Sequence, residues 1–98
     1  MRGVARMGDR TSGTCSVHGQ QNGVIVTASA DNIADNGMGV ARVGDLVQAD
    51  CGHQASIITG DSTHKVNDKT VARLGSIVQG DLYTATVTTA STKNIVND

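Results

Sequence analysis

The 98-residue chain contains no proline, tryptophan or phenylalanine, and its one aromatic residue is Tyr83. Aromatic side chains supply much of the burial energy of most cores, so this core has to be built from small aliphatic residues. A domain of this size also buries only a modest fraction of its surface. Both facts indicate added support from a metal, a partner or oligomerisation. The lack of proline leaves every backbone N–H free to pair.

Charge is also scarce, and this excludes several classes of protein. The sequence has 8 basic and 9 acidic residues, for a net charge of −1. Neither a basic run nor a set of aromatics for stacking on bases is present, which argues against nucleic-acid binding. No apolar stretch approaches the roughly 20 residues of a membrane span, and the N-terminus lacks the apolar core of a signal peptide.

What the chain does contain is an internal repeat. Val-Ala-Arg begins at Val4, Val40 and Val71, and an apolar residue, a glycine and an aspartate or serine follow each copy. A repeat of this length is one supersecondary unit that cannot bury its apolar face alone. The repeat therefore predicts one small domain around an approximate three-fold axis, or a very short solenoid. The predicted domain is 1–98, with repeats at about 4–39, 40–70 and 71–98.

The predicted fold class is all-β, with short strands and tight turns. Residues 23–27, 56–59 and 84–89 are short, rich in β-branched residues and bounded by glycine, aspartate and serine. No stretch shows helical periodicity. The 12 glycines suit tight turns between short strands.

The repeats also agree downstream of this block. Each copy has a serine, an apolar residue shortly before it and a turn-type pair after it. Equivalent serines in three copies predict a role in a turn rather than nucleophilic catalysis. The aligned positions are Ser29, Ser62 and Ser91, the apolar Ile25, Ile58 and Val87, and the turn residues Asn36, Asn67 and Asn97.

One segment of each repeat, between the glycine turn and the serine, varies in length. Insertions concentrate in loops, so rotation-related repeats would place all three variable loops at one end. Cys15, His18, Cys51 and His53 all lie in this segment. Zinc takes four tetrahedral ligands and accepts cysteine sulfur and histidine nitrogen. Such soft donors favour zinc or iron over magnesium or calcium.

The spacing of these residues leaves other interpretations open. The histidines could lie on the surface with buried cysteines, or Cys15 and Cys51 could form a disulfide. If all four residues bind one metal, a tetrahedral site is full and has no open position for water. That arrangement predicts a structural site and not an enzyme.

The arginines of the repeated block have two interpretations as well. Arg6, Arg42 and Arg73 recur with the repeat and could bind a partner. We favour a supporting role for each in its turn, through the carboxylates of Asp9 and Asp45 or through nearby carbonyls. Arg73 persists where a serine replaces the acid, which fits this role.

The three in-register blocks, each followed by a variable loop, an Ile/Val strand and an Asn turn, resemble the PAAR-repeat family over the whole chain. The family is named for Pro-Ala-Ala-Arg, whereas the copies here are Gly-Val-Ala-Arg twice and Thr-Val-Ala-Arg once. The resemblance implies a small cone-shaped β domain that sits as a monomer on the blunt end of a trimeric β-helical spike protein. It implies a place in a contractile phage tail or a type VI secretion system.

The resemblance further implies a metal near the tip, usually zinc and commonly bound by three histidines and one cysteine. The third repeat has neither residue in its loop. His64 follows the serine, on the part of the repeat that leads toward the base, and is predicted to be a surface residue. Otherwise it would replace one cysteine. The expected cofactor is one zinc or iron per chain, with the ligands Cys15, His18, Cys51 and His53.

The expected function is therefore that of a structural spike tip, with no enzymatic activity. It would cap and sharpen a membrane-piercing spike in a virion tail baseplate, or wait in the cytoplasm before export by a secretion apparatus. Val4 begins the first repeat and Asp98 ends the third, so no toxin extension is expected, which favours a phage tail. The alternatives are an adhesion or ligand-binding β-module and a small metal-dependent enzyme.

Overall fold

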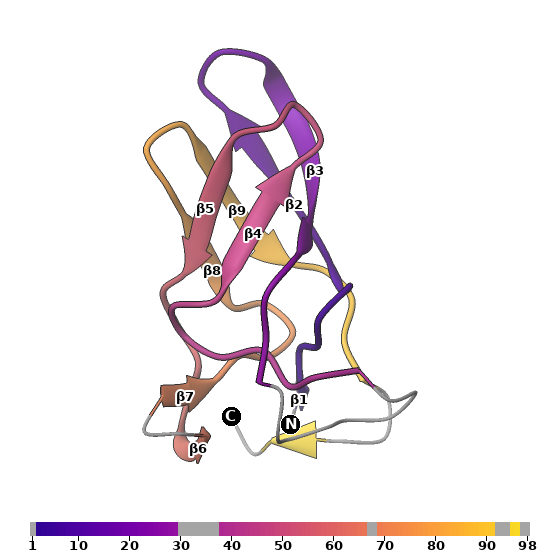
Figure 1. Cartoon of the computed structure of the whole chain (residues 1–98), viewed down its shortest axis with the longest axis vertical. Helices are drawn as coiled ribbons and strands as arrows, with labels where there is room; N and C mark the ends of the chain where they lie inside the picture. Colours follow the sequence, from indigo (N-terminus) through magenta and orange to yellow (C-terminus); the bar gives the residue numbers. More distant parts are fainter. Residues whose placement is uncertain (1, 30–37, 67–68, 92–94, 97–98) are drawn as a thin grey trace.

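The computed structural model describes residues 2–29, 38–66, 69–91 and 95–96 (Figure 1). Within them the chain forms ten strands and no helix, which confirms the all-β class. No helix in this part of the chain could therefore cross a membrane. The strands are β1 (Arg2–Gly3), β2 (Arg10–Cys15), β3 (Gly19–Ile25), β4 (Leu46–Ala49), β5 (Gln54–Ile57), β6 (Asp61–Val66), β7 (Lys69–Val71), β8 (Ile77–Gln79), β9 (Tyr83–Val87) and β10 (Ile95–Val96).

Six strands close into a barrel in the order β2-β3-β4-β5-β8-β9, and all of their pairings are antiparallel. The barrel consists of three hairpins, β2–β3, β4–β5 and β8–β9, one from each repeat. Closure leaves no open edge among these strands. The first hairpin is the longest, with strands of 6 and 7 residues against 4 and 4, and 3 and 5. Figure 1 shows all three hairpin turns at one end of the molecule.

Two small antiparallel pairs, β6–β7 and β1–β10, lie at the other end (Figure 1). The β1–β10 pair joins the two ends of the chain, with Arg2 opposite Val96 and Gly3 opposite Ile95. The first strand therefore completes the third repeat, and the chain closes into a ring. The turns predicted at Asn36, Asn67 and Asn97 lie outside the described residues.

The three repeats meet at a closed ring of backbone hydrogen bonds. The N–H of Ala5 donates to the carbonyl of Ala72, Ala72 donates to Ala41, and Ala41 donates back to Ala5, each at 2.9 Å. All three alanines are 0% exposed. Each comes from one Val-Ala-Arg block, so the repeated tripeptide forms the pseudo-three-fold axis. The ring shows rotational closure, and the solenoid alternative is wrong.

The second repeat aligns one residue away from the position expected from sequence. In every repeat the glycine of the Arg-x-Gly turn donates its N–H to a backbone carbonyl. The acceptor is the apolar residue that ends the second strand of that repeat's hairpin. In the second repeat Gly44 bonds to Ile57 at 2.8 Å. Ile57 is 1% exposed and Ile58 is 45% exposed, so the choice of Ile58 was wrong. A shift of one residue moves a side chain to the opposite face of a strand. The equivalent bonds join Gly8 to Ile25 and Gly75 to Val87.

The serine position of the second repeat shifts in the same way. Ser29 and Ser91 donate their backbone N–H to the carbonyl of the valine that starts a Val-Ala-Arg block, Val40 and Val4 respectively. In the second repeat the residue opposite the corresponding valine is Asp61, not Ser62. Ser29, Ser91 and Asp61 are all buried, at 4%, 3% and 0% exposure. A buried carboxylate thus takes the place of a buried hydroxyl.

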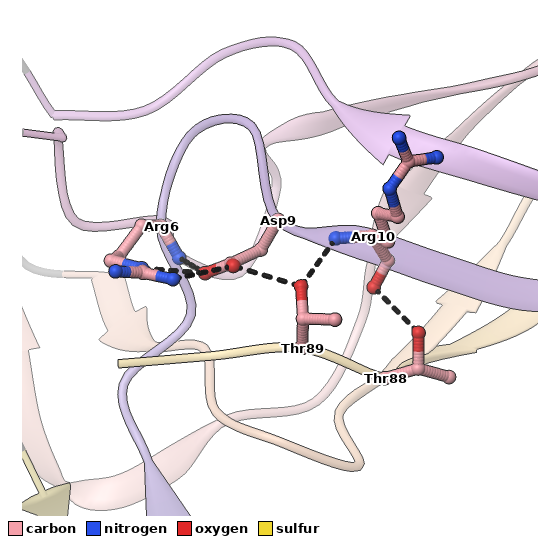
Figure 2. Close-up of polar contacts among 5 residues, drawn as sticks. All are labelled: Arg6, Asp9, Arg10, Thr88 and Thr89. Carbon is pink, nitrogen blue, oxygen red and sulfur yellow. Dashed lines mark hydrogen bonds and ion pairs between the residues drawn. The ribbon is translucent and has the colours of Figure 1, made fainter. Parts of the chain in front are cut away.

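The repeated arginines support their own turns, as predicted, and Figure 2 shows the first of these turns, at Arg6 and Asp9. Asp9 Oδ2 accepts the backbone N–H of Arg6 at 2.7 Å and its Nε–H at 2.9 Å, while Oδ1 accepts Nη2–H at 2.9 Å. The hydroxyl of Thr89, from the third repeat, also donates to Asp9 Oδ1 at 2.9 Å. Arg42, Asp45 and Thr27 repeat this arrangement. Each carboxylate therefore ties two repeats together.

In the third repeat a serine performs part of this task. Ser76 Oγ accepts the backbone N–H of Arg73 at 2.9 Å, and Arg73 Nη1–H donates to the Leu74 carbonyl at 3.3 Å. The backbone bond of the turn is therefore retained where the carboxylate is missing. The chain itself thus contains a natural comparison between the two kinds of turn.

Replacing the carboxylate of the first turn should measure its contribution. Asp9→Ala should lower the free energy of unfolding by about 2–4 kcal/mol, because Arg6 and Thr89 lose a common, mostly buried acceptor. Asp9→Ser, which copies the third repeat, should recover about 1 kcal/mol by accepting the backbone N–H again. Urea unfolding would measure both. Equal losses would contradict the assignment of the backbone bond.

Candidate metal centre

The first pair of donors lies at the turn between β2 and β3. Cys15 is the last residue of β2 and pairs with Gly19, the first residue of β3. Only Ser16, Val17 and His18 separate them, and Gly19 has a φ of 78°. Three-residue hairpin loops favour glycine at this left-handed position. The tight turn brings the side chains of Cys15 and His18 to the same side.

The second pair lies at the turn between β4 and β5. Ala49 donates its N–H to the carbonyl of His53 at 2.8 Å, and Gly52 donates to the carbonyl of Ala49 at 2.9 Å. Gly52 has a φ of 98°, a conformation that side chains rarely adopt. This turn holds Cys51 and His53 on either side of the glycine.

The four donor atoms converge although they come from two repeats. Cys15 Sγ lies 3.4 Å from His18 Nδ1 and 3.1 Å from His53 Nδ1, and Cys51 Sγ lies 3.6 Å from His53 Nδ1. One donor atom from each residue can be chosen so that all four lie within 4.8 Å of one another. A tetrahedral zinc with bonds of about 2.3 Å to sulfur and 2.0–2.1 Å to nitrogen separates S and N by about 3.5 Å. The cluster could therefore hold a metal ion.

The surroundings of Cys15 favour its deprotonated thiolate form. Cys15 is 1% exposed, and this burial by itself raises its pKa. Hydrogen bonds from the His18 side chain, the backbone N–H groups of Val17 and His18, and the His53 side chain outweigh burial and lower the pKa to about 6. The thiolate is the form that binds metals. Cys15 and Cys51 are both free, so the disulfide alternative is not formed.

The third repeat contributes no ligand to the cluster, but it places a buried tyrosine next to Cys15. Tyr83 is 0% exposed and lies opposite Cys15 in the β2–β9 pairing. Its hydroxyl is 2.9 Å from Thr11 Oγ1 and donates to the Gln21 carbonyl at 3.4 Å. Burial raises the pKa of Tyr83, so the phenol stays neutral. Tyr83 occupies the place in its repeat that His53 occupies in the second.

The role of Tyr83 was missed from sequence, where it was noted only as the one aromatic residue of the chain. The available signal was its uniqueness, because the only aromatic of a small domain is the largest apolar group it can bury. His64 belongs to β6, and Figure 1 shows β6 at the end of the molecule opposite the three hairpin turns. β6 therefore lies toward the end that was predicted to be the base, away from the variable loops.

A family model for the PAAR motif matches residues 18–81 of the chain. The chain belongs to the PAAR-motif family. The matched region covers the second and third Val-Ala-Arg blocks and β8 but not β9, and it includes three of the four clustered residues, with Cys15 just outside it. No curated protein matched the sequence. PAAR-motif proteins are spike-tip proteins of contractile injection systems and generally associate with the spikes of secretion and phage systems.

Proposed function

We propose that this PAAR protein caps the end of a trimeric β-helical spike in a contractile injection machine and forms its membrane-piercing tip. The observation that carries this proposal is the closed alanine ring, which gives a single chain pseudo-three-fold symmetry. A trimeric spike has a true three-fold axis. Matched symmetry lets each repeat contact one spike chain in nearly the same way, so one subunit can cap three.

The hairpin end of the barrel is the proposed tip, and the end with β1–β10 and β6–β7 is the proposed docking face. The composition supports a broad contact without a large aromatic anchor, because the sole aromatic is buried at 0% exposure. In this role the protein resides at the spike tip of a virion baseplate, or in the cytoplasm before export by a secretion apparatus.

We further propose that Cys15, His18, Cys51 and His53 bind one zinc or iron ion, with zinc preferred for a tetrahedral set of nitrogen and sulfur donors. A bound metal would cross-link the β2–β3 turn to the β4–β5 turn and stiffen the tip. Four protein donors would fill the coordination sphere, which supports a structural role without catalysis.

Stoichiometry tests the proposed function. Light scattering on the protein mixed with a trimeric spike from the same system should show one copy bound to three spike chains, while the free protein stays monomeric. A variant altered only at the tip, Cys51→Ala with His53→Ala, is the matched control and should still dock. A three-to-three complex, self-trimerisation or no binding would refute the symmetry argument.

A further inference from the structure

The two cysteines of the chain occupy matching positions in the first two repeats. Cys15 comes six residues after Asp9, the acid of the first turn. Cys51 comes six residues after Asp45, the acid of the second. The same position of the third repeat holds Leu82, and the chain has no other cysteine. Cysteine offers only its sulfur as a donor, so the two sulfurs of the cluster lie within 4.8 Å of each other.

The fold holds these two cysteines with different firmness. Cys15 ends β2 and is paired on both sides, with Gly19 of β3 and with Tyr83 of β9. Cys51 lies in the turn after β4, which ends at Ala49, so no strand pairing fixes it. A disulfide holds its sulfurs about 2.05 Å apart, so the sulfurs need to approach by at most about 2.8 Å. Movement of Cys51 in its turn would supply this approach while the barrel strands stay paired.

The two thiols also differ in their exposure to solvent. Cys15 is 1% exposed, whereas Cys51 is only partly buried. Oxidation of a cysteine follows its thiolate character and its exposure, so a dissolved oxidant meets Cys51 first. An accessible thiol with a second thiol close by is the usual arrangement of a redox-active pair, in which the second cysteine resolves the oxidised first one.

We propose that Cys15 and Cys51 form a redox site that exchanges a bound metal for an intramolecular disulfide, with a peroxide as the oxidant. The Cys51 thiolate attacks one peroxide oxygen, the O–O bond breaks, and hydroxide leaves a sulfenic acid on Cys51. The Cys15 thiolate then attacks the Cys51 sulfur, an S–S bond replaces the S–O bond, and a second hydroxide leaves. In total the two thiols lose two electrons and two protons, and the peroxide becomes two water molecules.

Metal and disulfide exclude each other at this site but link the same parts of the molecule. The thiolate is the form that binds metals, so the disulfide leaves only His18 and His53 as donors. Either link joins the β2–β3 turn to the β4–β5 turn. Disulfides persist outside the cell and are rare in the cytosol, so the tip would stay cross-linked in both. This consequence rests on the proposed function for the change of compartment, whereas the chemistry needs only the isolated chain.

Treatment of the zinc-loaded chain with hydrogen peroxide tests the exchange. A chromogenic chelator in the mixture should report one zinc released per chain. Mass spectrometry should show the loss of two hydrogen atoms, and peptide mapping should link Cys15 to Cys51. Dithiothreitol with added zinc should restore the loaded form. The inference would be overturned by intact thiols with retained zinc, by oxygen added to the sulfurs without a disulfide, or by disulfides between two chains.

The two single replacements form a matched pair that tests the order of the steps. Cys15→Ser keeps the accessible thiol and should yield a sulfenic acid that dimedone traps. Cys51→Ser keeps the buried thiol and should react about tenfold more slowly with peroxide. Both variants are compared without metal, and melting curves verify that they are folded. Equal rates would refute the assigned order, and the peptide map of the unaltered chain decides the disulfide even if one variant unfolds.

The melting temperature tests whether the disulfide replaces the metal as a cross-link. The oxidised chain should melt at least about 10 °C above the reduced, metal-free chain, because the disulfide restricts the unfolded state. Equal melting temperatures would refute the replacement. Spike docking measured in parallel separates the two proposals. Docking without disulfide formation refutes the redox site alone, whereas disulfide formation without docking supports the redox site and refutes the proposed function.

Discussion

Replacing Cys51 and His53 together with alanine should abolish stoichiometric metal binding and lower the melting temperature by roughly 15–30 °C. A metal at a thousand times its dissociation constant stabilises the folded state by about 4 kcal/mol, and each kcal/mol shifts the melting temperature of such a domain by about 4–8 °C. The two residues share one short turn, so the change removes half of the donors while the β2–β3 hairpin stays intact. Elemental mass spectrometry and calorimetry would measure both effects.

His64→Ala is the matched control for this experiment. It removes a histidine from β6, which lies at the end of the molecule opposite the hairpin turns (Figure 1), and it should leave one metal per chain. Loss of metal in this variant would show that His64 is a ligand and that one cysteine is not. Sub-stoichiometric metal in the unaltered protein would contradict the proposed centre itself.

The class of fold and the convergence of the four donors could be predicted because both follow from the repeat. A tripeptide that recurs three times predicts three repeats related by rotation about one axis. Repeats related in this way have their variable loops at the same end of the molecule. The prediction that the four candidate ligands converge did not require accurate strand boundaries. The exact register of the second repeat did need them, and there the prediction failed.

That failure has a local physical cause. Ile57 and Ile58 are the same residue type, so sequence gave no reason to choose between opposite faces of the strand. The serine used to align the repeats was misleading, because Asp61 performs the buried polar role of Ser29 and Ser91. The hydrogen bond from Gly44 to the Ile57 carbonyl and the burial of Ile57 distinguish the two registers in the structure.

For a related reason β2 was not predicted, and β3 was predicted only over residues 23–27 although it begins at Gly19. β2 between Arg10 and Cys15, and most of β3, consist of threonine, serine, glycine, glutamine and asparagine, which show little alternation of apolar and polar residues. These segments are strands because closure of the barrel pairs them on both sides. Tertiary pairing thus overrides weak local preference, and a sequence pattern cannot report it.

Ala41→Leu should destabilise the protein by about 3 kcal/mol, a large share of the roughly 5–15 kcal/mol that keeps a domain folded. Ala41 is 0% exposed, and its N–H and carbonyl bind Ala5 and Ala72 at 2.9 Å. Three backbone segments are therefore held together by hydrogen bonds at three fully buried alanines of one core cluster. A larger side chain can fit only if a ring hydrogen bond lengthens, and this would loosen the contact between all three repeats.

Val43→Leu is the control that the chain itself suggests. Val43 stands in the same turn, two residues past the alanine, and the equivalent positions hold Met7 and Leu74. The position therefore tolerates larger apolar groups, and because Val43 is only partly buried the change should cost less than about 0.5 kcal/mol. Urea unfolding of both variants would compare them directly. Similar losses at the two positions would mean that the alanine ring is not the tight point of the fold, and the identity of the alanine in all three repeats would then need another cause.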